Sequence, residues 1–177
     1  MKTYIALLKG INVGGHKKVP MAELRDLLAK SGFQNVQTYI QSGNVVFQTH
    51  DKSIQKIEET IEKAIIDYFG FEVSVIVKTN PDLQLIFDSC PFENAKKEKS
   101  YFIMLNKVPE RNLIERADKI FYDDEEIIIK NNCLYFYCSK GYGQSKFNMN
   151  TYERKLNVIG TSRNYNTMVK LLSLSTD

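Results

Sequence analysis

Short apolar runs occur in the same order twice along this chain. The run Tyr4–Leu8 returns as Tyr101–Leu105, and Lys18-Val-Pro20 returns as Lys107-Val-Pro109. The runs at 4–8 and 101–105 are apolar throughout, which is typical of a strand buried on both faces of a sheet. A repeated pattern restricts the fold strongly because both copies are expected to share one architecture.

The first half has the signals of a β-α-β-β-α-β unit. Gly32 and Gly70 each precede a phenylalanine and end an amphipathic segment, a common helix terminator. The second of these segments has one apolar face, formed by Ile54, Ile57, Ile61, Ile65 and Tyr68. We expect strands at 4–8, 36–40, 45–47 and 73–77, and helices from Pro20 to Gly32 and from Ser53 to Gly70. This order is the ferredoxin-like arrangement.

The second half repeats most of that order. We expect a strand at 101–105, a helix after Pro109, a hairpin of 126–129 and 134–138, and a last helix near 164–174. Asn150 with Glu153 three residues later resembles a capping box, which predicts a helix that begins there and runs through Leu156. The final strand of the repeat is missing from this pattern or replaced by the last helix.

We therefore predict an α+β fold of two ferredoxin-like β-α-β-β-α-β halves from an internal duplication, the second half modified at its C-terminal end. The predicted domains are residues 1–92 and residues 100–177, the latter with C-terminal helices, joined by a charged connector at 93–99. The hydrophobic fraction of 43% is ordinary for a globular protein. No run reaches the ~18 apolar residues of a membrane span, so we expect a soluble, cytoplasmic protein and no membrane partner.

The loop after the first strand is the clearest candidate for function. The opening strands are offset by 97 residues and the Lys-Val-Pro segments by 89, so the first half holds eight extra residues before its first helix. The second half shows that the elements connect without them, and long loops on a rigid scaffold tend to bind ligands.

Positive charge gathers in two glycine-containing segments of a chain whose net charge is +3. Residues 9–18 hold three lysines and no acid, and residues 140–146 form a second basic loop. Glycine backbone N–H groups, lysines and a helix N-terminus suit an anion. The candidate ligand-binding residues are Lys9, Asn12, Gly14, Gly15, Lys17, Lys18, Gly141, Gly143, Ser145, Lys146, Arg163 and Asn164.

Each candidate has a structural alternative. The first loop is also consistent with a merely structural connection, and the second with a solvated turn in which Tyr142 packs as a lid. Arg163 is equally suited to pair with a carboxylate of the connector. Tyr135 and Tyr137 share one strand face, where they either stack on bases, as in an RNA-recognition fold, or are buried between the halves.

No motif predicts a reaction. Gly10–Gly15 has the spacing of a phosphate loop, but His16 stands where the Walker A motif needs Lys. His16 lacks an orienting partner for acid–base work, and it does not form a metal-ligand pair with His50. The three cysteines match no zinc spacing, so we expect reduced, mostly buried thiols, no metal and no cofactor. The acidic run 123–126 is expected to be a solvated hairpin edge.

Long segments of the chain resemble one bacterial family. They are residues 4–15, residues 18–25 (Lys-Val-Pro-Met-Ala-Glu-Leu-Arg), residues 38–47 (Thr-Tyr-Ile-Gln-Ser-Gly-Asn-Val-Val-Phe), 153–156 and 161–167. The family is domain of unknown function 1697, and the resemblance implies a soluble α+β protein with duplicated ferredoxin-like halves. It implies no activity, cofactor or catalytic residue. Relatives often carry Arg in place of Lys9 and Gln144, and Lys does not bind phosphate in the bidentate manner of Arg.

Three hypotheses of function follow. The first is binding of a phosphate-bearing ligand, a nucleotide or nucleic acid, through the basic glycine-rich loops. The second is an enzyme acting on a small anionic metabolite in a cleft between the halves, with catalytic residues unknown. The third is a structural or interaction module without a ligand. The sequence leaves the oligomeric state open.

Overall fold

The computed structural model describes residues 1–117 and 122–176. The chain forms two compact units, unit 1 of Met1–Gln84 with Lys170–Asp177 and unit 2 of Leu85–Val169. The chain enters unit 2 within α3 (Asn80–Asp88) and returns to unit 1 within α7 (Tyr165–Leu174). The boundary predicted at 93–99 marks the point at which the sequence repeat begins again. The division into compact units does not test it, so it stays a prediction.

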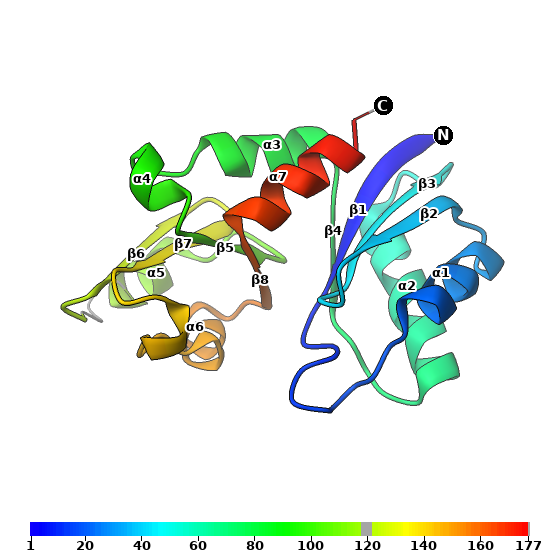
Figure 1. Ribbon diagram of the computed structural model, residues 1–177, viewed down its shortest axis with the longest axis horizontal. Helices are drawn as coiled ribbons and strands as arrows, with labels where there is room; N and C mark the ends of the chain where they lie inside the picture. The colour runs from blue at the N-terminus through cyan, green and yellow to red at the C-terminus, as the bar shows by residue number, and fades with distance from the viewer. Residues whose placement is uncertain (118–121, 177) are drawn as a thin grey trace. The chain divides into compact units, whose positions relative to one another are not determined.

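Unit 1 contains one four-stranded antiparallel sheet in the order β2-β3-β1-β4. Its elements are β1 (Lys2–Leu8), α1 (Met21–Lys30), β2 (Gln34–Tyr39), β3 (Asn44–Thr49), α2 (Ile54–Phe69) and β4 (Val75–Lys78). Helices α1 and α2 lie side by side over one face of this sheet (Figure 1). The expected β-α-β-β-α-β order is confirmed for this unit.

Alternate residues of β1 form the core beneath the two helices. Tyr4, Ala6 and Leu8 pack with buried leucines of α1 and with Ile57, Ile61 and Ile65 of α2. The apolar face of α2 is shorter than predicted, because Ile54 and Tyr68 at its two ends are exposed. The hydroxyl of Tyr68 donates instead to Glu23 Oε2 at 3.3 Å.

Local signals determine the helix ends in unit 1 as expected. The hydroxyl of Ser53 accepts a hydrogen bond from the N–H of Lys56 at 3.3 Å and caps α2. Gly70 has a left-handed φ of +80° at the other end. After α1, Gly32 has φ +95° and the N–H of Phe33 donates to Leu28 O at 3.2 Å. Both glycine terminators are confirmed.

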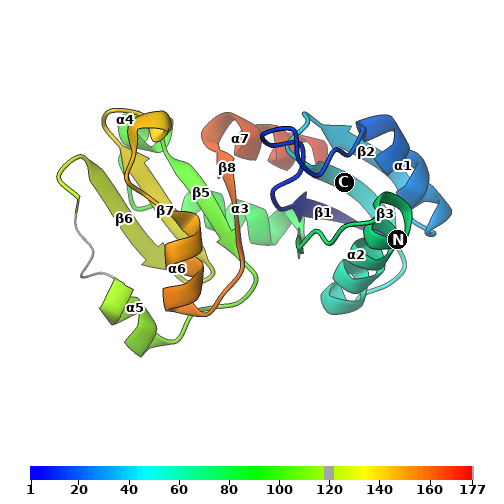
Figure 2. The same ribbon diagram turned by 90° about the horizontal axis from the view of Figure 1, so that it is seen from below.

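Unit 2 contains a second four-stranded antiparallel sheet, in the matching order β6-β7-β5-β8. Its elements are α4 (Asn94–Lys97), β5 (Tyr101–Leu105), α5 (Arg111–Ala117), β6 (Glu125–Lys130), β7 (Cys133–Cys138), η1 (Tyr142–Gln144), α6 (Met149–Leu156) and β8 (Gly160–Asn164). Helices α5 and α6 cover one face (Figure 2). The α+β class with two sheets of ferredoxin-like order is confirmed.

The expectation that the second repeat lacks its final strand is wrong. Strand β8 pairs with β5 over residues 160–164 and completes the sheet. Its sequence, Gly-Thr-Ser-Arg-Asn, has no apolar side chain, so hydrophobic alternation does not reveal it. The ladder with β5 holds this polar segment in place, and Thr161 and Arg163 are buried there.

The predicted capping box at Asn150 is also wrong. Asn148 caps α6, since its side-chain oxygen accepts from the N–H of Thr151 at 3.2 Å. Glu153 Oε1 accepts from the N–H of Gly160 at 2.7 Å, beyond the end of the helix. This carboxylate therefore ties α6 to the beginning of β8. Among the described residues, no helix is long and apolar enough to cross a membrane.

Candidate functional site

Residues 9–20, which connect β1 to α1, form the longer of the two matching connections. In unit 2 only residues 106–110 separate β5 from α5. The N–H of Leu8 donates to Gly43 O at 2.8 Å, and the N–H of Lys9 donates to Ser74 O at 3.0 Å. Within the loop, Ile11 and Val19 are buried in the core. The long loop is therefore anchored at both ends.

Asn12 holds the base of this loop together. Its amide nitrogen donates to Val19 O at 3.0 Å and to Gln41 O at 2.9 Å, while its amide oxygen accepts from the N–H of Val19 at 2.8 Å. Its backbone is left-handed, with φ +54°, a conformation that Asn tolerates well. The side chain predicted as a ligand contact thus joins the two ends of the loop to the β2–β3 turn.

The β2–β3 turn packs against the base of the loop, and it was not among the predicted site residues. A Cβ at Gly43 would lie 2.7 Å from Leu8 Cβ and 2.9 Å from Ile11 Cδ1, at a φ of +80°. Only glycine fits such a position without strain. The Ser-Gly-Asn signal at 42–44 predicted a turn, but its contact with a loop some 30 residues earlier depends on the sheet pairing.

The tip of the loop is exposed. Residues 13–18 all lie at the surface, and Gly14 and Gly15 both have positive φ. The Lys17 ammonium donates to Glu72 O at 2.6 Å, so it is oriented toward the end of the α2–β4 connection. Lys18 is exposed and Lys9 is half-buried. The tip therefore presents glycine backbone and lysine charge, with no carboxylate among residues 9–20.

The second predicted loop, residues 140–146, belongs to unit 2. Lys140 pairs with Asp124 at 2.5 Å, and this ion pair lowers the pKa of Asp124. Tyr142 packs against Tyr101, with ring centroids 4.4 Å apart, which agrees with a packing lid. The Lys146 N–H donates to Glu125 Oε1. Gly141, Gly143 and Ser145 form the short turn η1 and its flanks.

Arg163 and Asn164 lie on β8 of unit 2. The Arg163 guanidinium is buried and donates to Thr161 Oγ1 and Ser162 O, both at 2.8 Å. Burial lowers the pKa of Arg163 to about 10, so it is still charged at neutral pH. The Asn164 side chain accepts from the N–H of Thr167 at 2.9 Å and begins α7. Both side chains therefore make contacts within β8 and α7.

Tyr135 is not available for base stacking. Its ring is buried against Phe102, with centroids 5.8 Å apart, and its hydroxyl donates to Ile86 O at 2.7 Å. Tyr137 is half-buried, with Phe92 and the Lys96 ammonium beside its ring. The shared aromatic face is thus covered by residues of unit 2 itself.

The acidic run at the start of β6 forms ion pairs at its surface. Asp124 pairs with Lys140, and Glu126 pairs with Lys96 at 2.5 Å. No group of three or more His, Cys, Asp and Glu side chains suited to a metal ion occurs among residues 1–117 and 122–176. In the same ranges Cys133 and Cys138 are buried free thiols and Cys90 is a half-buried one.

An acidic cavity of about 550 Å³ lies in unit 1 between α2 and the segment before β4. Glu59, Glu62 and Glu72 line it with a single lysine, Lys63. Lys63 already pairs with Asp67 at 3.1 Å. Three carboxylates repel a phosphate, so this cavity does not suit the predicted class of ligand.

A smaller, basic pocket of about 350 Å³ lies at the start of β1, at the opposite end of that strand from the loop. Lys2, His50 and Lys52 line it, and none of its lining residues is acidic. All three of these side chains are exposed. Because these charges are exposed to water, which screens them, they attract an anion only weakly.

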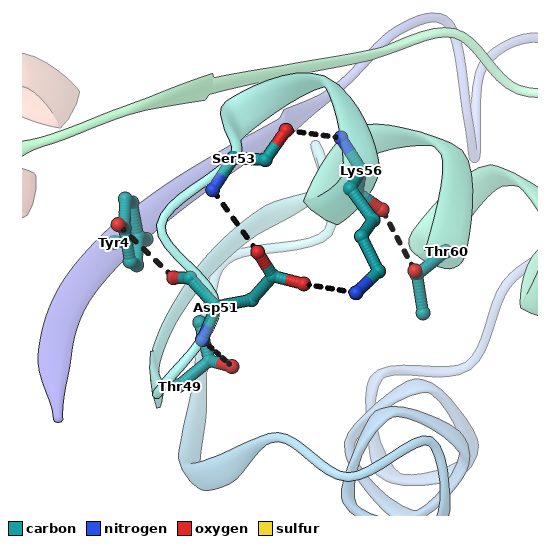
Figure 3. Close-up of polar contacts among 6 residues, drawn as sticks. All are labelled: Tyr4, Thr49, Asp51, Ser53, Lys56 and Thr60. Carbon is teal, nitrogen blue, oxygen red and sulfur yellow. Dashed lines mark hydrogen bonds and ion pairs between the residues drawn. The ribbon is translucent and has the colours of Figure 1, made fainter.

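The neighbouring acid, Asp51, is held by α2 (Figure 3). Its carboxylate accepts from the N–H of Ser53 at 3.0 Å and pairs with the Lys56 ammonium at 2.9 Å. The hydrogen bond from Lys56 is the main cause of the lowered pKa of Asp51. The Tyr4 hydroxyl donates to Asp51 O at 3.2 Å, which joins β1 to this helix start.

Comparison with known proteins agrees with the fold and names no activity. Residues 1–135 match the family model described as "Protein of unknown function (DUF1697)". A solved structure, that of the conserved bacterial protein SP0830 from Streptococcus pneumoniae, is similar with a TM-score of 0.72 and 24% identity. The similarity covers 98% of each chain. No curated protein matches this chain.

Proposed function

Since this chain belongs to the DUF1697 family, whose description assigns no function, we propose one from the geometry of unit 1. The loop of residues 9–18 binds a phosphate-bearing ligand through its exposed tip, residues 13–18. Gly14, Gly15 and Lys18 are the contact residues, and Lys9 and Lys17 add positive charge. Asn12 keeps the loop in its binding conformation.

One observation supports this proposal above the others: the loop is rigid at its base and polar and cationic at its tip. Asn12 and the buried Ile11 hold the base, and the Lys17 ammonium ties the tip to Glu72 O. The N–H groups of Gly14 and Gly15 take part in none of the hydrogen bonds that hold the loop. Preorganised backbone donors beside lysines suit phosphate oxygens.

The shape of the loop favours the backbone of a nucleic acid over a free nucleotide. Small-molecule sites are concave, whereas residues 13–18 of the loop are all exposed. A projecting basic loop suits an extended polyanion, whose phosphates are reached from outside. Because Tyr135 is buried, we expect phosphate contacts without base stacking, and therefore little sequence preference.

The test is oligonucleotide binding by the full chain, measured by fluorescence anisotropy at two salt concentrations. Affinity is expected to fall steeply between 50 and about 200 mM salt as counterions are released. K18E is expected to weaken binding about tenfold at low salt, because it reverses a charge at the tip. K52E, at an exposed lysine of the basic pocket, is the matched control.

Three outcomes would contradict the proposal. They are no binding at 50 mM salt, equal affinity of K18E and the wild type, and equal weakening by K52E. A thermal shift with mononucleotides but no oligonucleotide binding would replace the polyanion by a small ligand.

We also propose how the chain is divided into domains and in which compartment it occurs. The matching strand orders of the two sheets support an origin of both halves by duplication, with the connector at 93–99. Free thiols at the buried Cys133 and Cys138 support a reducing compartment, the cytoplasm.

A further inference from the structure

The four sheet edges of the two units differ in how they are protected. At β4 of unit 1, the N–H of Val77 donates to Glu58 Oε1 at 2.8 Å and the N–H of Val75 donates to Glu62 Oε1 at 2.9 Å. Both glutamates come from α2, so this helix covers the edge. Free N–H groups on an edge strand invite another strand, and such covering prevents that pairing.

Of two further edges, one is distorted and the other is covered at its first residue. Strand β2 has an irregular register between Gln34 and Gln37, and Asn35 in between has φ +50°. Such a distortion disfavours regular pairing with a new strand. In unit 2, the N–H of Gly160 at the start of β8 is bound by Glu153.

Strand β6 is a regular edge on which, among the described residues, no side chain binds the outward N–H groups of Ile127 and Ile129. It pairs with β7 over all six of its residues without a register shift, and it is the outermost strand of its sheet (Figure 2). The N–H of Ser139 donates to Asp124 O, so residues 124, 126, 128 and 130 direct their backbone groups toward β7. The backbone groups of Ile127 and Ile129 therefore point away from the sheet.

The exposed side chains of β6 are complementary in charge to the same side chains of a second, antiparallel β6 strand. Glu126, Ile128 and Lys130 are exposed on one face, whereas Ile127 and Ile129 pack against the core on the other. The exposed face has an acid at one end, an isoleucine in the middle and a base at the other end. When this strand is reversed, the acid meets the base.

We propose that β6 pairs with β6 of a second copy of this chain, antiparallel and centred on Ile128. In this register Glu126 lies opposite Lys130 of the second copy, twice by symmetry, and the two Ile128 side chains meet at the axis. Ile127 of one copy and Ile129 of the other exchange backbone hydrogen bonds. The two four-stranded sheets then form one continuous sheet.

The backbone selects this register. In an antiparallel pair, two opposed residues either both direct their backbone groups toward the partner strand or both direct them away. The symmetry axis must therefore pass through a residue of β6, because an axis between two neighbouring residues would oppose one of each kind. Moving the centre to Ile127 or Ile129 places Glu126 opposite Ile128 or Asn132 instead of Lys130. At the Ile128 centre, the Glu126–Lys130 pairs fall at non-hydrogen-bonded positions, where cross-strand side chains are closest.

Sedimentation of the full chain over a range of concentrations tests the proposal. The wild type is expected to form a dimer, whereas E126K and K130E each place like charges opposite one another and weaken it about tenfold. An equimolar mixture of the two variants is expected to dimerise again, because every opposed pair is then Glu with Lys. The double variant E126K/K130E is expected to dimerise like the wild type.

Two controls separate this effect from damage within one chain. Glu126 pairs with Lys96 in its own chain, so K96A removes that pair without touching the β6 face and is expected to keep the dimer. Circular dichroism of each variant reports its folding. The proposal is overturned if the wild type stays monomeric up to about 0.5 mM, if the single variants dimerise like the wild type, or if the mixture of folded variants stays monomeric.

Discussion

Units 1 and 2 share one strand order but differ in the connection between their first strand and first helix. In unit 1 this connection is long, and Gln41, Gly43 and Glu72 all contact it. In unit 2, residues 106–110 complete the same connection, with Asn106 binding Ile159 across the end of the sheet. The fold therefore does not need the long loop, and the contacts that hold it serve the loop itself.

The largest expected effect concerns the two glycines that contact the core beneath these connections. G43A is expected to lower the free energy of unfolding by about 2–4 kcal/mol, because it adds a close contact at a left-handed φ. Urea unfolding measures it.

The same glycine-to-alanine change at Gly160, the first residue of β8 in unit 2, is expected to cost less. At Gly160 the backbone is not left-handed, and the closest group is the flexible end of Met149. G160A is therefore expected to cost about 1–2 kcal/mol. If G43A and G160A lower the free energy of unfolding equally, the left-handed φ of Gly43 does not matter.

A second comparison uses the two asparagines. Asn12 donates two hydrogen bonds through its amide nitrogen, whereas Asn106 accepts one through its amide oxygen, which Asp also provides. N12D is expected to cost about 1–3 kcal/mol and to speed proteolysis within residues 9–20. N106D is expected to cost less than about 0.5 kcal/mol, as for a surface substitution. If N12D leaves the loop as resistant to protease as the wild type, Asn12 does not hold it.

The edge of β4, which α2 covers, provides a third comparison, with the regular edge of β6. E58A exposes the N–H of Val77 and is expected to cost about 1–2 kcal/mol, while E58Q keeps an oxygen acceptor and is expected to cost less. Unfolding in urea measures both. E58A as stable as E58Q would show that the covering is unimportant.

Glu58 also predicts a dependence on pH. Burial raises its pKa in the folded protein above the ordinary value of 4.5. The folded protein then binds the proton more readily than the unfolded chain, so this group contributes stability that is present at low pH and lost as the pH rises through the raised pKa. E58Q is expected to remove that dependence.

The smallest effects are expected at two exposed ion pairs, one in each unit. Asp51 with Lys56 and Asp124 with Lys140 both have an aspartate whose pKa is lowered by its lysine. Such a group contributes stability above the ordinary aspartate pKa and loses it as the pH falls through the lowered value. D51N and D124N are expected to lower the melting temperature slightly at pH 7 and not at about pH 2. A larger loss of melting temperature at about pH 2 than at pH 7 would contradict the stabilising role of these ion pairs.

Much of the fold was predictable because its signals are local. Gly32, Ser53 and Gly70 end or begin helices through contacts within a few residues, and the apolar runs of β1 and β5 identify buried strands. Strand β8 was missed because its residues are polar and the ladder with β5 alone makes it a strand. Asn148 was missed as a helix cap because Asn150 with Glu153 has the same local pattern.

The candidate site was predictable only in its position along the chain. Comparison of the repeats identified residues 9–18 as an addition to the scaffold. It did not identify the role of Asn12, because its partner Gln41 is brought near by the pairing of β1 with β3. Nor did it distinguish Lys17, which binds Glu72 O, from Lys18, which lies at the surface.

Local signals in the amino-acid sequence specify the repeated order of elements, the helix termini and a basic loop free of carboxylates. These properties depend on residues close together in the chain. The tertiary structure alone decided which polar groups remain available. Hydrogen bonding saturates an amide or an edge N–H once a partner arrives, and here those partners arrive from tens of residues away, as Glu58 does for Val77.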